Sequence, residues 1–87
     1  MSNRLPAWFE FLRIEADLAI VFIDTAKASS IPENSARSLG NARKALEQIR
    51  RVLANPIGLV TEETEFLEQC CVEIEAALLA FRPGTHQ

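Results

Sequence analysis

The sequence predicts an all-α protein, a three-helix antiparallel bundle with up-down-up topology. Three stretches, at about 6–29, 32–54 and 61–81, repeat apolar residues every three or four positions, which is the spacing of one helix face. Breaks at 29–33 and 55–58 contain the Ser, Pro and Gly residues that end helices. The composition agrees, because only three Gly and four Pro residues occur. Short connections between three helices favour antiparallel neighbours.

The chain length of 87 residues predicts a single helical domain, 1–87, with flexible ends at 1–5 and 83–87. A chain of this size buries only about 60–65% of its unfolded surface, so its core is small. Apolar residues nevertheless make up 48% of the sequence, which is high for a small monomer. We therefore expect apolar surface beyond what one core can bury.

The first helix is the most apolar part of the chain, and we expect the other two helices to pack on it. Its run 18–23 reads Leu-Ala-Ile-Val-Phe-Ile, and a helix that is apolar on so much of its circumference needs more than one partner. Trp8, Phe9 and Phe11 fall within four residues near its start, so the three rings cannot all enter one core. Either the rings close the end of the bundle, or at least one of them belongs to a binding patch.

Glu15 is the one charged residue on the central apolar line of the first helix, between Phe11 and Leu18. Counting outward from the short turn places it near Arg43 and Arg50 of the second helix. We interpret Glu15 as one half of a partly buried ion pair with Arg43 or Arg50 that sets the helix register. The alternatives are a side chain that reaches solvent at the edge of the bundle and a catalytic or ligand-binding carboxylate.

Local signals predict how the second and third helices begin. Ser30 and Glu33 have the spacing of a capping box, and Thr61 is the expected N-cap of the third helix. Gly40 lies inside the second helix, where glycine costs about 1 kcal/mol relative to alanine. The same count from the turn places Gly40 opposite Phe22, so we interpret the glycine as space for that ring.

No motif for catalysis, metal binding or nucleotide binding stands out in the sequence. The only histidine is His86, in the tail, so no base is available within the helices for a Ser or Cys nucleophile. The same absence excludes the Glu-x-x-His pairs of a di-metal helical site. We expect no enzyme activity, no cofactor, no metal and no evident small-molecule substrate.

The two cysteines, Cys70 and Cys71, are adjacent within the third helical stretch. Neighbouring cysteines do not fit ordinary disulfide geometry, and the nearby Glu68 and Glu73 disfavour the thiolate. We interpret both as reduced thiols that fill space, and a redox-sensing thiol at one of them is an alternative function. Reduced thiols, together with no signal peptide and no membrane-spanning run, predict a cytoplasmic, bacterial-type protein.

The charge is unevenly distributed along the chain, although the net charge is only −3. The last third is acidic, and the middle third is basic, with Arg37, Arg43, Lys44, Arg50 and Arg51. Opposite signs on neighbouring helices attract one another, which is the simpler reading. An accessory nucleic-acid-binding face on the second helix is the other reading, but no aromatic residue is interleaved with these cations and the net charge is negative.

Two pairs of apolar residues lie outside the faces that a three-helix core needs. Ile14 and Val21 are seven residues apart on the first helix, and Val72 and Leu79 are seven apart on the third. A two-fold dimer would bury such residues. The sequence therefore predicts a small non-enzymatic helical module for protein–protein interaction or assembly, which forms a homodimer or binds another helical protein.

Overall fold

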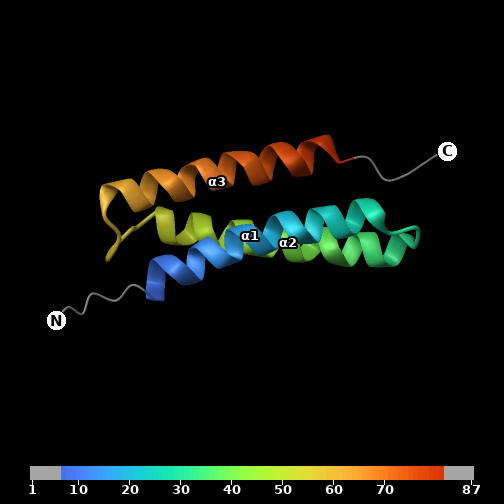
Figure 1. Cartoon of the computed structure of the whole chain (residues 1–87), viewed down its shortest axis with the longest axis horizontal. Helices are drawn as coiled ribbons and strands as arrows, with labels where there is room; N and C mark the ends of the chain where they lie inside the picture. The colour runs from blue at the N-terminus through green and yellow to red at the C-terminus, as the bar shows by residue number, and fades with distance from the viewer. Residues whose placement is uncertain (1–6, 82–87) are drawn as a thin grey trace.

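The computed structural model describes residues 7–81, which form three α-helices joined by short loops (Figure 1). The chain runs along α1, turns back through α2 and returns along α3, so the predicted up-down-up bundle is confirmed. Every helix boundary agrees with its prediction to within one residue. The helices are α1 at Ala7–Ala28, α2 at Pro32–Leu53 and α3 at Thr61–Ala80.

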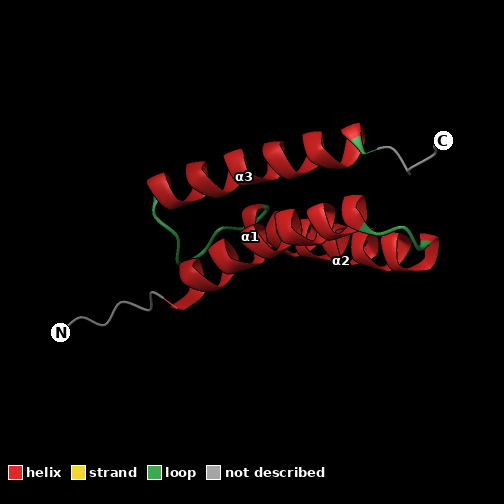
Figure 2. Cartoon of the chain, turned by 45° about the vertical axis from the view of Figure 1, so that its right-hand side comes forward, coloured by secondary structure: helices red, strands yellow, loops and turns green. Residues whose placement is uncertain are grey.

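The core is built from one side of each helix, and small side chains bring α1 and α2 close together. Ala16 and Ala19 of α1 and Ala42 and Ala45 of α2 are buried between these two helices, which lie side by side in Figures 1 and 2. α3 lies along both helices and contributes Leu67 and Ile74 to the core. The largest fully buried side chains are Leu12, Ile23, Ile49, Leu67 and Ile74.

The start of α2 differs from its predicted cap. Ile31 is the N-cap residue, and no side chain caps this helix end. The predicted capping box of Ser30 and Glu33 is therefore wrong by one position. Instead, the Ser29 hydroxyl accepts the Ile31 N–H at 3.1 Å, which holds the turn from outside the helix. The Ser35 hydroxyl donates to the Ala26 carbonyl at 2.9 Å, and this hydrogen bond joins α2 to α1.

The start of α3 shows a similar displacement. Val60, and not Thr61, is the N-cap residue. The Glu63 carboxylate accepts the Val60 N–H at 3.1 Å, which is the half of a capping box that needs no hydroxyl on the cap residue. The predicted flexible ends, 1–5 and 83–87, lie outside the described residues.

Gly40 does not have the packing role that we predicted. A Cβ atom built on Gly40 would meet no other heavy atom within 4 Å. Phe22 is partly buried and packs against the core. The reason is rotational, because Gly40 is two residues, or about 200° of helix, away from the buried Ala42. Gly40 therefore lies off the side of α2 that faces α1.

Candidate functional site

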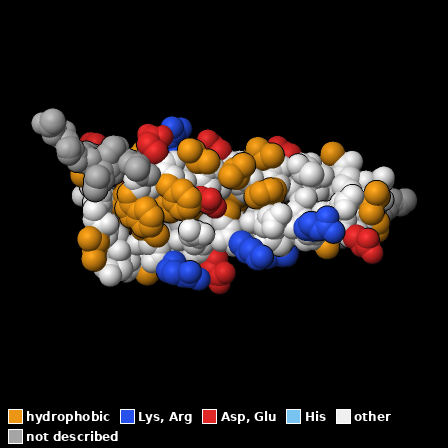
Figure 3. Space-filling view, turned by 90° about the horizontal axis from the view of Figure 1, so that it is seen from below, with side chains coloured by type: hydrophobic (Ala, Val, Ile, Leu, Met, Phe, Trp, Pro, Cys, Tyr) orange, Lys and Arg blue, Asp and Glu red, His pale blue; other side chains and the backbone are white. Residues whose placement is uncertain are grey.

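α1 carries an exposed apolar surface, which we call the α1 face. It consists of five large side chains that follow one another at helical spacing, and their exposed fractions range from 40% to 52%. Figure 3 shows hydrophobic side chains gathered along this side of the molecule, which is turned away from α3. The residues of the α1 face are Trp8, Phe11, Ile14, Leu18 and Val21.

The aromatic residues near the start of α1 divide between the core and this surface. Phe9 turns toward α3 and meets Phe66 edge to face, with ring centroids 5.8 Å apart and an interplanar angle of 66°. Trp8 and Phe11 stack on each other, with centroids 6.1 Å apart and planes 3° from parallel, and each is 40% exposed. One ring therefore closes the bundle, as one reading predicted, and two rings belong to the surface.

The two apolar pairs that we expected outside the core are exposed. Ile14 and Val21 are 51% and 52% exposed on α1, and Val72 and Leu79 are 56% and 82% exposed on α3. The pairs point in different directions, because the α1 face is turned away from α3. A two-fold contact through the α1 face would therefore leave Val72 and Leu79 uncovered, and burial of these residues in a dimer stays a prediction.

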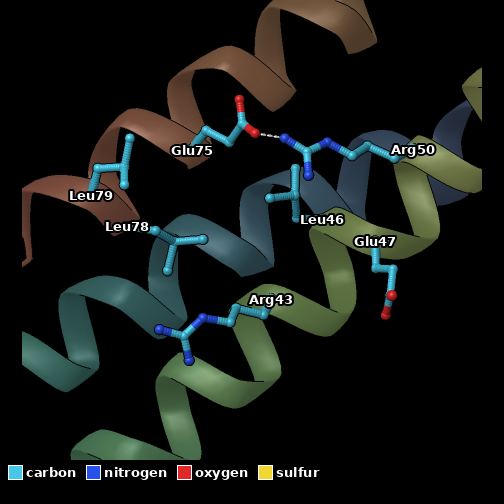
Figure 4. Close-up of a pocket in the computed structure, with 7 residues that line it drawn as sticks. All are labelled: Arg43, Leu46, Glu47, Arg50, Glu75, Leu78 and Leu79. Carbon is cyan, nitrogen blue, oxygen red and sulfur yellow. Dashed lines mark ion pairs between the residues drawn. The ribbon is translucent and has the colours of Figure 1, made fainter.

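Glu15 is partly buried at the edge of the α1 face. Within residues 7–81 it forms no ion pair with Arg43 or Arg50, so the predicted register-setting pair is wrong. Arg50 pairs instead with Glu75 of α3 (Figure 4). The reason is that Arg43 and Arg50 share with Leu46 the side of α2 that faces α3. Counting residues from the turn predicted which residues of α2 lie at the level of Glu15. It did not predict how α2 is rotated about its axis, which decides the side chains that face Glu15.

A groove of about 530 Å³ lies between α2 and α3, and Figure 4 shows the side chains that line it. The ion pair of Arg50 and Glu75 joins the two helices across it, and Glu47 is turned away from α3. A second cavity, of about 720 Å³, begins near the α1–α2 turn and shares Arg43 and Leu78 with the groove. Among the described residues, no group of three His, Cys, Asp or Glu side chains is placed to hold a metal ion.

The cysteines are free and lie on the inner side of α3. Cys71 is 7% exposed in the core, and Cys70 is partly buried beside it. Burial raises the pKa of both thiols, and the carboxylates of Glu73 and Glu68 raise those of Cys70 and Cys71 further. Arg50 acts in the opposite direction on the pKa of Cys71, but with a smaller effect than burial. Both thiols are thus protonated at neutral pH, which makes them weak nucleophiles.

Two rows of exposed charged side chains border the α1 face. In Figure 3, mostly acidic side chains, with a basic one among them, lie along one side of the hydrophobic run, and basic side chains, with acidic ones beside them, lie along the opposite side. Members of each row are seven residues apart, so each row keeps to one side of its helix. The acidic row is Glu10, Asp17 and Asp24 of α1. The basic row is Arg37, Lys44 and Arg51, on the outer side of α2 that also carries Gly40 and the exposed Glu33 and Glu47.

The acidic row makes one ion pair among the described residues, and that pair stays within α1. The Arg13 guanidinium donates to Glu10 at 2.6 Å, and this hydrogen bond raises the pKa of Arg13. No described ion pair joins the acidic row to the basic row, because the α1 face lies between them. The seven-residue spacing of both rows is visible in the sequence, but their positions on either side of one apolar surface are not.

Comparisons with protein-family models, curated protein sequences and solved structures find no match to this chain. None of the helices within residues 7–81 combines the length and the hydropathy needed to cross a membrane. The molecule is thus a three-helix bundle whose most distinctive surface is an exposed apolar helix face between two rows of opposite charge.

Proposed function

We propose that this protein is a non-enzymatic helical interaction module that forms a homodimer through the α1 face. The observation that carries the proposal is the row of five large apolar side chains, each 40–52% exposed, on one side of α1. Continuous exposed apolar surface of this kind is typical of protein–protein contacts. A helix of 22 residues is about 33 Å long, so the α1 face can receive a second helix along several turns.

The apolar contact and the cost of association are of similar size. Complete burial of a large apolar side chain is worth about 1.5–3 kcal/mol, and the side chains of the α1 face are already roughly half buried. Five of them on each copy contribute on the order of 10 kcal/mol to a dimer. Association itself costs about 4–15 kcal/mol. We therefore expect a reversible dimer whose affinity depends on the charged residues around the apolar contact.

A cytoplasmic location is part of the same proposal. Both cysteines are free in the structure, and one of them is in the core. Free thiols persist in reducing compartments, whereas secreted domains of this size commonly use cysteines in disulfides.

Light scattering on a sizing column, over a range of protein concentrations, tests the dimer. The wild type is expected to approach twice the chain mass of 9.7 kDa at high concentration. Leu18→Glu introduces a charge into the α1 face and is expected to hold the protein at the monomer mass. Val72→Glu is the matched control, because Val72 is 56% exposed on α3 and lies outside the proposed contact. A wild-type mass of 9.7 kDa at every concentration contradicts the proposal.

A further inference from the structure

The acidic and basic rows at the edges of the α1 face also determine how two copies can meet. Two identical surfaces related by a two-fold axis can pack in two simple ways. An axis along α1 makes the two α1 helices parallel, and each edge of one copy then meets the opposite edge of its partner. An axis across α1 makes the helices antiparallel, and each edge then meets its own equivalent.

We propose that two copies pack α1 against α1 in parallel, so that the acidic row of each copy lies on the basic row of the other. The inference rests on the proposed dimer and adds its arrangement. In the antiparallel alternative, acidic side chains would face acidic ones and basic would face basic, which opposes association. Only the parallel arrangement buries the α1 face and brings opposite charges together.

Each residue of the acidic row lies at the same level along the bundle as one residue of the basic row. α1 and α2 are antiparallel, and the hydrogen bond from Ser35 to the Ala26 carbonyl shows which residues of the two helices stand at the same level. Moving two residues along both helices from that level, and then seven residues, or about two turns, at a time, brings each acidic residue level with one basic residue. The level pairs are Asp24 with Arg37, Asp17 with Lys44 and Glu10 with Arg51.

A two-fold axis along α1 preserves these levels between copies. Asp17 of one copy therefore lies beside Lys44 of the other copy, and the other two level pairs behave in the same way. Within one chain the α1 face separates the rows, so their charges become partners only across the dimer. All six side chains are exposed, so they are available for this contact.

Charge reversal tests the arrangement, with dimer dissociation constants measured by sedimentation equilibrium at low salt. The first variant reverses the basic row, R37E/K44E/R51E, and the second reverses the acidic row, E10K/D17K/D24K. In the parallel dimer, each variant places like charges opposite one another along both edges. We expect each to weaken its own homodimer by on the order of 100-fold. The variant that carries all six changes restores opposite charges and is expected to dimerise within a few-fold of the wild type.

An equimolar mixture of the two triple variants tests whether the edge charges act across the contact, which holds for either arrangement. One variant then has two acidic edges and the other has two basic edges, so the mixture is expected to form a heterodimer as the homodimers are lost. Far-ultraviolet circular dichroism of each variant checks that it keeps its helices, and the recovery in the six-fold variant shows that lost dimerisation is not lost folding. Added salt is expected to weaken the wild-type dimer, because it screens the attraction between the rows.

The outcomes separate the arrangement from the dimer itself. If the wild type dimerises, Leu18→Glu disrupts the dimer and both triple variants retain the wild-type affinity, the parallel arrangement is overturned in favour of the antiparallel one, while the proposed function stands. If added salt strengthens the wild-type dimer, the same conclusion follows. If Leu18→Glu and both triple variants all retain the wild-type affinity, the dimer uses another surface and both proposals fail. If the wild type is monomeric at every concentration, the proposed function fails and the arrangement fails with it.

Discussion

Gly40 offers a sharp test of the helix packing, because the structure predicts that alanine stabilises the protein there. A glycine in a helix interior costs about 0.5–1 kcal/mol relative to alanine, since the unfolded chain has more freedom to lose. A Cβ atom at this position would meet nothing within 4 Å, so no clash offsets the gain. We expect Gly40→Ala to raise the free energy of unfolding by about 0.5–1 kcal/mol.

The same change at Gly58 is the matched control, and it is expected to act in the opposite direction. Gly58 has a φ of 88°, in the left-handed region, where an L-residue costs about 1–2 kcal/mol. The new Cβ would be 3.9 Å from the Cδ1 atom of Trp8, which is an ordinary contact. Backbone conformation alone therefore sets the sign, and Gly58→Ala is expected to destabilise the protein by about 1 kcal/mol or more.

Thermal unfolding followed by circular dichroism measures both changes. A difference of 1 kcal/mol shifts Tm by about 4–8 °C in a domain of this size, so the two variants should fall on opposite sides of the wild type. All samples need the same protein concentration, because a dimer makes Tm depend on it. A Tm for Gly40→Ala at or below that of the wild type would refute the reasoning and would restore Gly40 as a packing residue.

Three further predictions concern Glu15, the core and the thiols. Glu15→Leu removes a charge beside the α1 face and is expected to tighten the dimer by about tenfold, measured by sedimentation equilibrium. Leu12→Ala empties a fully buried site and is expected to cost about 2–5 kcal/mol in urea unfolding, whereas Leu79→Ala, at an 82% exposed position, should cost almost nothing. Burial raises the pKa of Cys70 and Cys71, so the unfolded chain loses these protons first and stability falls above about pH 8.5. The Cys70→Ala/Cys71→Ala variant should show a shallower fall over that range, and an equally steep fall would contradict the role of the thiols.

The fold could be predicted because its signals are local. Helix hydrogen bonds join residues four apart, so the apolar spacing and the breaks around Pro32 and Pro56 place the helices within one residue. The same short range explains why Ile14, Val21, Val72 and Leu79 were correctly expected outside the core. Their positions around each helix follow from the spacing alone.

The candidate site could be predicted only in part. Trp8 and Phe11 were recognised as rings that one core could not bury, but the sequence left their place open. The pairing of Glu15 was wrong, because the count from the turn carries no information about rotation. The wrong reading of Gly40 has the same cause. How far α2 is rotated about its own axis depends on the closest packing of alanines between α1 and α2, which is a property of the two helices together.

The sequence by itself determined the three helices, the surplus of apolar residues on α1 and the seven-residue spacing of both charged rows, because each of these is periodic along one segment. The tertiary structure decided that α2 lies beside α1 with its basic row at the edge of the α1 face, level with the acidic row on the other edge. That arrangement depends on the relative rotation and height of two helices, which only their packing sets. The charge pattern on which the proposed parallel dimer depends therefore exists in the folded molecule and not in any one segment of the chain.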